Sequence, residues 1–231
     1  MSLDFASGSL SAIIGPNGAG KTTLFNLVCG TVRPDRGEIL LDGQALQGLM
    51  PRQVARRGLA RAFQVASLFP SFTPWQSFCA AAVPQRLGVA GLLSGFPRQA
   101  GRRRADEVIA LLGLDVGAHT PVEQLSHGGQ KMVDIGIALC ARPHVLLLDE
   151  PTAGMGPEER WHMVETVRKL WQSTGLTVLF IEHDMDIVFS VAQDVTVLSY
   201  GAILARGTPQ AVRTDPGVIR AYLGSYAKDA A

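Results

Sequence analysis

The chain has 231 residues, 47% hydrophobic and 18% charged, and this composition excludes an intrinsically disordered protein. Its length predicts one domain, or one domain with an inserted subdomain. The 21 Lys and Arg residues nearly balance the 20 Asp and Glu residues, and the net charge of +1 gives no general attraction for nucleic acid or for an anionic membrane. Any recognition of phosphate must therefore be local.

The cysteines and the apolar segments point to a reducing compartment and to no membrane span. Cys29, Cys79 and Cys140 are odd in number and far apart, so we expect neither a disulfide framework nor a CxxC metal site. The longest apolar stretch, residues 135–148, is broken by Arg142 and a proline and is too short to cross a bilayer. We expect no signal peptide, because the start has no basic region followed by a long apolar one.

The first third of the chain alternates between strand and helix patterns. Residues 10–14 form a short apolar run that is typical of a strand, and residues 22–29 carry apolar side chains at helical spacing. Residues 38–42 predict a second strand, and residues 51–57 predict a helix.

A glycine-rich segment lies between the first strand and the first helix, where it fills the pattern G-x-x-x-x-G-K-[ST] at every position. In this pattern backbone N–H groups surround the β-phosphate of a nucleotide, Lys21 reaches the β- and γ-phosphates, and the Thr22 hydroxyl binds Mg²⁺. An accidental glycine-rich turn is the alternative, and the strand before it and the helix after it argue against that. The predicted phosphate-binding residues are Gly15, Pro16, Asn17, Gly18, Ala19, Gly20, Lys21, Thr22 and Thr23.

The middle of the chain has a different character. Residues 69–117 are rich in Pro, Gly and Arg until an amphipathic helical pattern returns at residues 105–112. We therefore expect a helical subdomain inserted at about 69–117 into an α/β core formed by residues 1–68 and 118–231. The basic run at residues 102–104 is interpreted as an exposed helix start rather than as a phospholipid contact.

The second half of the chain returns to the α/β pattern and predicts a mostly parallel central sheet with a small antiparallel element. The predicted elements are a buried helix at residues 131–140, a buried strand at 145–148, a helix beginning at 157, a strand at 177–181, a helix at 185–192 and a hairpin of 195–198 with 203–205.

Two acidic residues, Asp149 and Glu150, directly follow the buried strand at residues 145–148. At the carboxyl end of such a strand, Asp149 would hold Mg²⁺ through water and Glu150 would orient or deprotonate the water that attacks the γ-phosphate. A strand that merely ends in solvated acids is the alternative. The phosphate-binding pattern upstream favours the functional interpretation.

The segment LSHGGQ, residues 125–130, precedes the buried helix and resembles the signature loop LSGGQ of the ATP-binding cassette (ABC) ATPases. It departs from that loop at His127, which replaces a glycine, and at Gly129, which stands in the glutamine position. A serine hydroxyl, glycines and a helix N-terminus are together suited to an anion, although they also fit a capped helix with no ligand. The resemblance implies that Ser126, Gly128 and Gly129 contact the γ-phosphate held by another subunit.

Two single residues extend the resemblance, which runs from about residue 10 to the C-terminus. Gln64, in the segment RAFQ, matches the glutamine that contacts the metal or water and links ATP occupancy to the transmembrane partner. His183 follows a predicted strand and matches the histidine that contacts the γ-phosphate. Either residue alone would be an ordinary surface or capping residue. The resemblance implies Glu150, His183 and Gln64 as catalytic residues and Thr22, Gln64 and Asp149 as metal ligands.

The segments at residues 153–157, 181–185 and 207–224 are similar to those of ATPase subunits of branched-chain amino acid importers. The urea or amide importer ATPases are similar in the same segments and are the alternative. The resemblance implies an ATP-hydrolysing subunit that uses ATP and Mg²⁺ and pairs with a second ATPase subunit, as a homodimer or a paralogous heterodimer. It also implies transmembrane permease subunits, indirectly a solute-binding protein, no nucleic acid, and a peripheral place at the cytoplasmic face of the plasma membrane.

The chain departs from the family at two further places. Gly156 stands where most members have an Asp that crosses the dimer interface. Most members also have another strand and an adenine-stacking aromatic before the phosphate loop, where this chain offers only Phe5. We therefore expect either that the chain begins about one strand late or that Phe5 is a poor substitute for that aromatic. Loss of that stacking contact would weaken nucleotide binding by about 1–3 kcal/mol.

Three rival classes would share the phosphate loop but differ elsewhere. A P-loop kinase would carry an acceptor lid in place of the signature loop and His183, and a DNA-repair or chromosome-maintenance ATPase would carry a long heptad insertion. A translation-type cassette protein would contain two sets of motifs. The single set found here favours a transporter ATPase.

Overall fold

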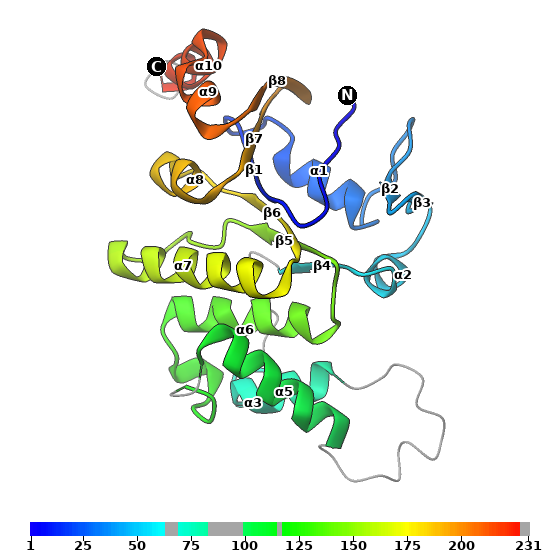
Figure 1. Cartoon of the computed structure of the whole chain (residues 1–231), viewed down its shortest axis with the longest axis vertical. Helices are drawn as coiled ribbons and strands as arrows, with labels where there is room; N and C mark the ends of the chain where they lie inside the picture. The colour runs from blue at the N-terminus through cyan, green and yellow to red at the C-terminus, as the bar shows by residue number, and fades with distance from the viewer. Residues whose placement is uncertain (63–68, 83–98, 115–116, 227–231) are drawn as a thin grey trace.

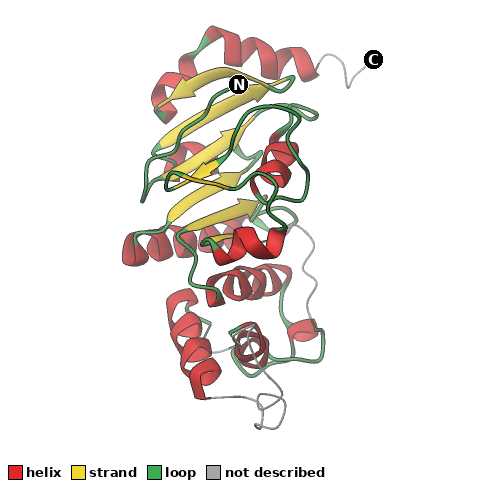
Figure 2. Cartoon of the chain, turned by 90° about the vertical axis from the view of Figure 1, so that its right-hand side faces the viewer, coloured by secondary structure: helices red, strands yellow, loops and turns green. Residues whose placement is uncertain are grey.

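A six-stranded sheet forms the centre of the molecule (Figures 1 and 2). The structure is a computed structural model, and it describes residues 1–62, 69–82, 99–114 and 117–226. The five strands β4, β5, β6, β1 and β7 are parallel, and β8 is antiparallel to β7 at the edge. In sheet order the strands are β4 (Leu59–Ala62), β5 (Val145–Asp149), β6 (Thr177–Ile181), β1 (Leu10–Ile14), β7 (Asp194–Ser199) and β8 (Ala202–Gly207). The predicted α/β fold with a mostly parallel sheet is confirmed.

The antiparallel parts of the fold are small. The predicted hairpin is present as β7 and β8, which turn at Tyr200 and Gly201, both with positive φ. The strand predicted at residues 38–42 is shorter, because β2 (Leu40–Leu41) pairs only with β3 (Gln44–Ala45) in a separate two-stranded sheet. Strand β4 was not predicted, since a charged residue interrupts its short sequence LARA.

Helices cover both faces of the central sheet, and a further helical layer lies beyond one end of it (Figures 1 and 2). In that layer α3 and α5 pack against each other and against α6. Both come from the stretch predicted as a helical insertion, and its division from the α/β core stays a prediction. The helices are α1 (Lys21–Val28), α2 (Pro51–Arg56), α3 (Pro74–Ala81), α5 (Gln99–Leu112), the short 3₁₀ helix η1 (Val122–Gln124), α6 (His127–Cys140), α7 (Pro157–Thr174), α8 (Met185–Val191), α9 (Pro209–Thr214) and α10 (Pro216–Tyr226).

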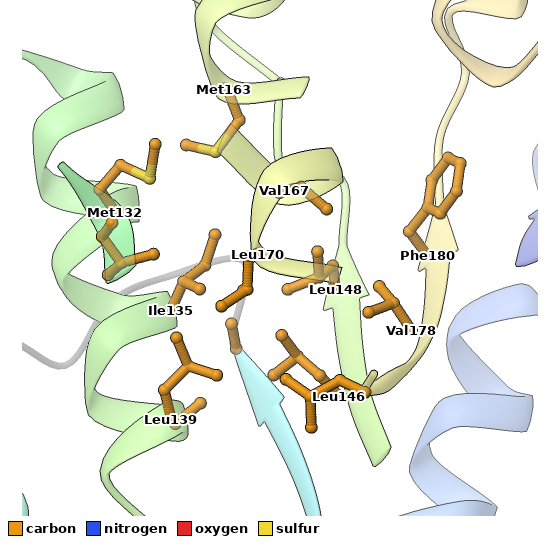
Figure 3. Packing of buried hydrophobic residues seen from close by; sticks show 14 of the residues in the cluster. Met132, Ile135, Leu139, Leu146, Leu148, Met163, Val167, Leu170, Val178 and Phe180 are labelled. Atoms are coloured by element: carbon orange, nitrogen blue, oxygen red, sulfur yellow. The ribbon is translucent and has the colours of Figure 1, made fainter. Parts of the chain in front are cut away.

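Strand β5 is buried on both faces, as its unbroken aliphatic sequence requires. Leu146 and Leu148 pack into the larger core between the sheet and helices α6 and α7 (Figure 3), whereas Leu147 points into a second core that contains Phe25 of α1. Burying a side chain of this size stabilises the fold by about 1.5–3 kcal/mol. The two cores therefore fix the position of β5, and with it the acidic residues at its end.

No helix in the described part of the chain is long and apolar enough to cross a membrane. Cys29, Cys79 and Cys140 are buried, and each is a free cysteine.

Candidate functional site

The phosphate loop joins the end of β1 to the start of α1 and depends on glycine for its shape. A Cβ atom at Gly15, whose φ is +151°, would lie 2.2 Å from the carbonyl oxygen of Leu198 in the neighbouring strand β7. Only glycine fits so close to that backbone. The loop ends at Gly20, the left-handed residue before α1, and the hydroxyl-bearing residues Thr22 and Thr23 are exposed in the first turn of that helix.

Lys21 is the buried cation of this loop, with 6% of its surface exposed. Its ammonium donates hydrogen bonds to the carbonyl oxygens of Gly15, at 2.7 Å, and of Pro16, at 3.2 Å. Burial lowers the pKa of Lys21, and the charges of Glu150 and Asp149 oppose that shift. A positive charge that is already desolvated attracts phosphate more strongly than one in open water.

Asp149 ends strand β5 and is 4% exposed. Its Oδ2 atom forms an ion pair with Arg61 of β4, and Arg61 also donates a 2.7 Å hydrogen bond to Asn26 in α1. The Oδ1 atom of Asp149 is buried and has no hydrogen-bond partner within the described ranges. A buried carboxylate oxygen without a partner fits the prediction that Asp149 holds a hydrated Mg²⁺, an ion that is bound by few carboxylates and keeps several waters.

Glu150 and His183 are brought together by adjacent strands. Asp149 of β5 lies beside Ile181 of β6, and the backbone N–H of Glu150 donates to the carbonyl of Ile181 at 3.0 Å. Glu150 has a left-handed backbone, with φ at +49°, and its Oε1 atom lies 2.7 Å from Nε2 of His183. This strained turn directs the carboxylate away from the strand and toward the histidine.

Two buried charged residues that the sequence analysis missed hold the loop after β5. Lys131 of α6 donates from its ammonium to the carbonyl oxygens of Glu150, at 2.7 Å, and Ala153, at 3.0 Å, and burial lowers its pKa. Glu182 accepts hydrogen bonds on one carboxylate oxygen from the backbone N–H and hydroxyl of Thr152, at 2.9 and 2.7 Å. Charged residues inside an apolar helix and directly after a buried strand were the signals that could have identified them.

The signature loop, defined as residues 125–130, begins helix α6. The Oγ atom of Ser126 accepts a 3.1 Å hydrogen bond from the N–H of Gly129 and donates a 2.6 Å hydrogen bond to Glu159 of α7. The N–H of Gly128 donates to the same Glu159 oxygen at 3.0 Å. Among the described residues, no hydrogen bond or ion pair joins this loop to the phosphate loop.

Three other positions were singled out in the sequence. Gln64, predicted as a catalytic residue and metal ligand, lies outside the described residues. Gly156 precedes α7 with a φ of −67°, and a Cβ atom there would meet nothing within 4 Å. The ring of Phe5 packs against the second core, which contains Phe25, and the guanidinium of Arg206 lies 5.6 Å from the centroid of that ring.

Known families and proteins resemble the chain over most of its length. The ABC transporter family matches residues 1–153, and the branched-chain amino acid ATP-binding cassette transporter family matches residues 202–228. The high-affinity branched-chain amino acid transport ATP-binding protein LivG of Escherichia coli K12 is 37% identical over 97% of this chain and 90% of its own. The corresponding protein BraF of Pseudomonas aeruginosa is 38% identical over 92% of this chain and 86% of its own.

A solved structure is similar in three dimensions. The ADP conformation of MJ1267, an ATP-binding cassette of an ABC transporter, superposes with a TM-score of 0.81 and 28% identity over 94% of this chain and 89% of that one.

Proposed function

The chain belongs to the ATP-binding cassette family of transporter ATPases, and we propose that it powers the import of branched-chain amino acids through a separate membrane permease. Its ATPase activity follows from the family. The choice of solute is supported by the family match at residues 202–228 and by the names of LivG and BraF. The predicted urea or amide importer is the alternative outcome of the test below.

The observation that carries the catalytic proposal is the order of three neighbouring strands. β1, β6 and β5 are parallel and adjacent, and the phosphate loop, His183 and Glu150 follow their carboxyl ends. In open α/β sheets, ligands bind at this edge. The backbone N–H groups of the loop and the ammonium of Lys21 would hold the ATP phosphates there.

The reaction needs one base and one means of aligning it. Glu150 would orient and deprotonate the water that attacks the γ-phosphate, and the 2.7 Å contact with His183 Nε2 would hold its carboxylate in place. Thr22, Asp149 and Gln64 would hold Mg²⁺, which neutralises charge on the phosphates. Lys131 and Glu182 position the loop after β5 through their hydrogen bonds to Glu150, Ala153 and Thr152.

The second half of the site would come from another subunit. Ser126, Gly128 and Gly129 form a helix N-terminus with anion-binding donors, yet they share no hydrogen bond with the phosphate loop of their own chain in its described part. A dimer, either of this chain or with a related ATPase, would place two ATP molecules between opposed phosphate and signature loops. The dimer would bind permease subunits peripherally at the cytoplasmic face of the membrane, and a solute-binding protein would act with them.

The test is to purify the tagged chain in mild detergent with the membrane proteins that accompany it and to measure ATP-driven uptake into vesicles. We expect copurification of permease subunits and uptake of leucine, isoleucine or valine that stops when Glu150 is replaced by Gln. Uptake of urea instead would support the alternative solute. A permease that exports its solute would contradict the proposal.

A further inference from the structure

Glu159 occupies the anion-binding donors of the signature loop. One of its carboxylate oxygens accepts hydrogen bonds from the Ser126 hydroxyl, at 2.6 Å, and from the Gly128 N–H, at 3.0 Å. The approach is so close that a Cβ atom at Gly128 would lie 2.5 Å from that oxygen. A carboxylate of the same chain therefore lies where the signature loop would receive a phosphate.

The donors involved cannot serve two acceptors at once. A serine hydroxyl has a single proton, and in Ser126 this proton is donated to Glu159 while the oxygen accepts from Gly129. The backbone of Gly128 likewise has one N–H, which also points at Glu159. A γ-phosphate can be bound by these groups only if both hydrogen bonds to Glu159 break.

The Glu159 carboxylate and the γ-phosphate are both negatively charged, so they cannot occupy the same donors together. Glu159 is half-buried in the first turn of α7, and its carboxylate also lies at the N-terminus of α6, so two helix dipoles favour its negative charge there. An incoming γ-phosphate would bring more negative charge to the same donors. Two negative groups that share the same two donors repel each other, so the carboxylate must leave when the phosphate arrives.

We propose that Glu159 is a built-in competitor of ATP at the signature loop. Its carboxylate keeps the Ser126 and Gly128 donors satisfied until the γ-phosphate of ATP, held by the partner subunit, displaces it. Glu159 thereby raises the ATP concentration at which the dimer closes. This inference rests on the proposed two-subunit site and adds a means of regulating its closure.

The neighbouring residue provides a matched control. Glu158 is one position earlier in the same helical turn, is exposed, and makes no hydrogen bond to the signature loop within the described residues. Replacing either glutamate by Ala removes one negative charge from the N-terminus of α7. Only the change at Glu159 releases the donors of the signature loop.

The experiment measures dimer closure in a chain that cannot hydrolyse ATP, with any second ATPase subunit that copurifies. Glu159→Ala, Glu159→Gln and Glu158→Ala are each introduced with Glu150→Gln, and the dimer fraction is followed by sedimentation velocity as Mg²⁺-ATP is added. We expect Glu159→Ala to lower the half-saturating ATP concentration about tenfold, as loss of a competing charged hydrogen bond predicts. Glu159→Gln should give a smaller decrease, and Glu158→Ala should match the parent.

The results that would contradict the inference are equally distinct. If Glu159 instead positions Ser126 for the phosphate, Glu159→Ala will raise the half-saturating ATP concentration, and an unshifted curve would also overturn the competitor role. If every variant stays monomeric at all ATP concentrations, the two-subunit site fails, and the role of Glu159 fails with it. Glu159→Gln preserves side-chain size and an acceptor oxygen, so it answers the question even if the Ala variant does not fold.

Discussion

The two regions of the chain that are proposed to bind phosphate are built in opposite ways. At the carboxyl ends of β1, β5 and β6, the phosphate loop and Glu150 are held by buried ions, among them the Arg61–Asp149 ion pair and the Lys131 hydrogen bonds to the loop after β5. Among the described residues no ion pair holds the signature loop, whose Ser126 and Gly128 donors instead bind the carboxylate of Glu159. In the first region buried charges hold the loop after β5, whereas in the second region the donors are satisfied by a carboxylate of the same chain.

This difference predicts how substitutions in each region will act. Buried ion pairs and hydrogen bonds fix a geometry, and the fold loses stability when one partner is removed. Exposed donors that exchange one acceptor for another can respond to a partner subunit. Substitutions in the first region should therefore act within a single chain, and those in the second should act between chains.

The largest effect is expected for Glu150→Gln. This change removes the base but keeps the size of the side chain, so steady-state ATP hydrolysis should fall by about 100- to 10,000-fold. ATP binding, which depends on the phosphate loop, should be preserved when it is measured by equilibrium titration. Turnover within a few-fold of the parent chain would exclude Glu150 as the base.

Arg61→Met tests the support beneath the phosphate site. It leaves the buried carboxylate of Asp149, whose side chain is 2% exposed, without its ion-pair partner. The free energy of unfolding in urea, without nucleotide, should fall by about 3–5 kcal/mol. Asp149→Asn in the same chain should restore part of that loss, because it removes the uncompensated charge. A loss below about 1 kcal/mol would show that the pair is not needed for this rigidity.

Lys131→Met should have the smaller effect of the two buried substitutions. It leaves the Glu150 and Ala153 carbonyls without their donor, so unfolding in urea should require about 1–3 kcal/mol less. A loosened Glu150 should also lower kcat more than it changes KM for ATP. The matched control is Lys169→Met, because the Lys169 side chain is 70% exposed in a surface pair with Glu165 that should contribute less than about 1 kcal/mol. Equal effects of both changes would contradict a positioning role for Lys131.

The residues of the catalytic region that the sequence predicted are those fixed by local patterns. The phosphate loop, Asp149, Glu150 and His183 each lie at the end of a strand or within two residues of it, and the apolar sequence of each strand marks that end. Arg61 and Glu159 could not be assigned, since their partners lie 88 and 33 positions away in the chain. Contacts of that kind depend on which strands and helices become neighbours.

The same reasoning explains the differences in the fold. The hairpin of β7 and β8 was predictable from two apolar runs around a turn at Tyr200 and Gly201. Strand β4 was missed because Arg61 breaks its pattern, and Arg61 is there because it pairs with a buried acid. The charged residue that interrupts the apolar pattern of β4 is thus the residue that pairs with Asp149.

The central claim is that each ATP site combines the phosphate loop of one subunit with the signature loop of another, and mixing two inactive variants tests it most directly. Lys21→Ala disables the phosphate loop and Ser126→Ala disables the signature loop, so each protein alone should hydrolyse ATP poorly. In a mixed dimer one of the two sites is intact, and random pairing should restore about one quarter of the parent activity. A mixture that stays as inactive as its components, although sedimentation velocity shows that the chain pairs with itself, would contradict the account.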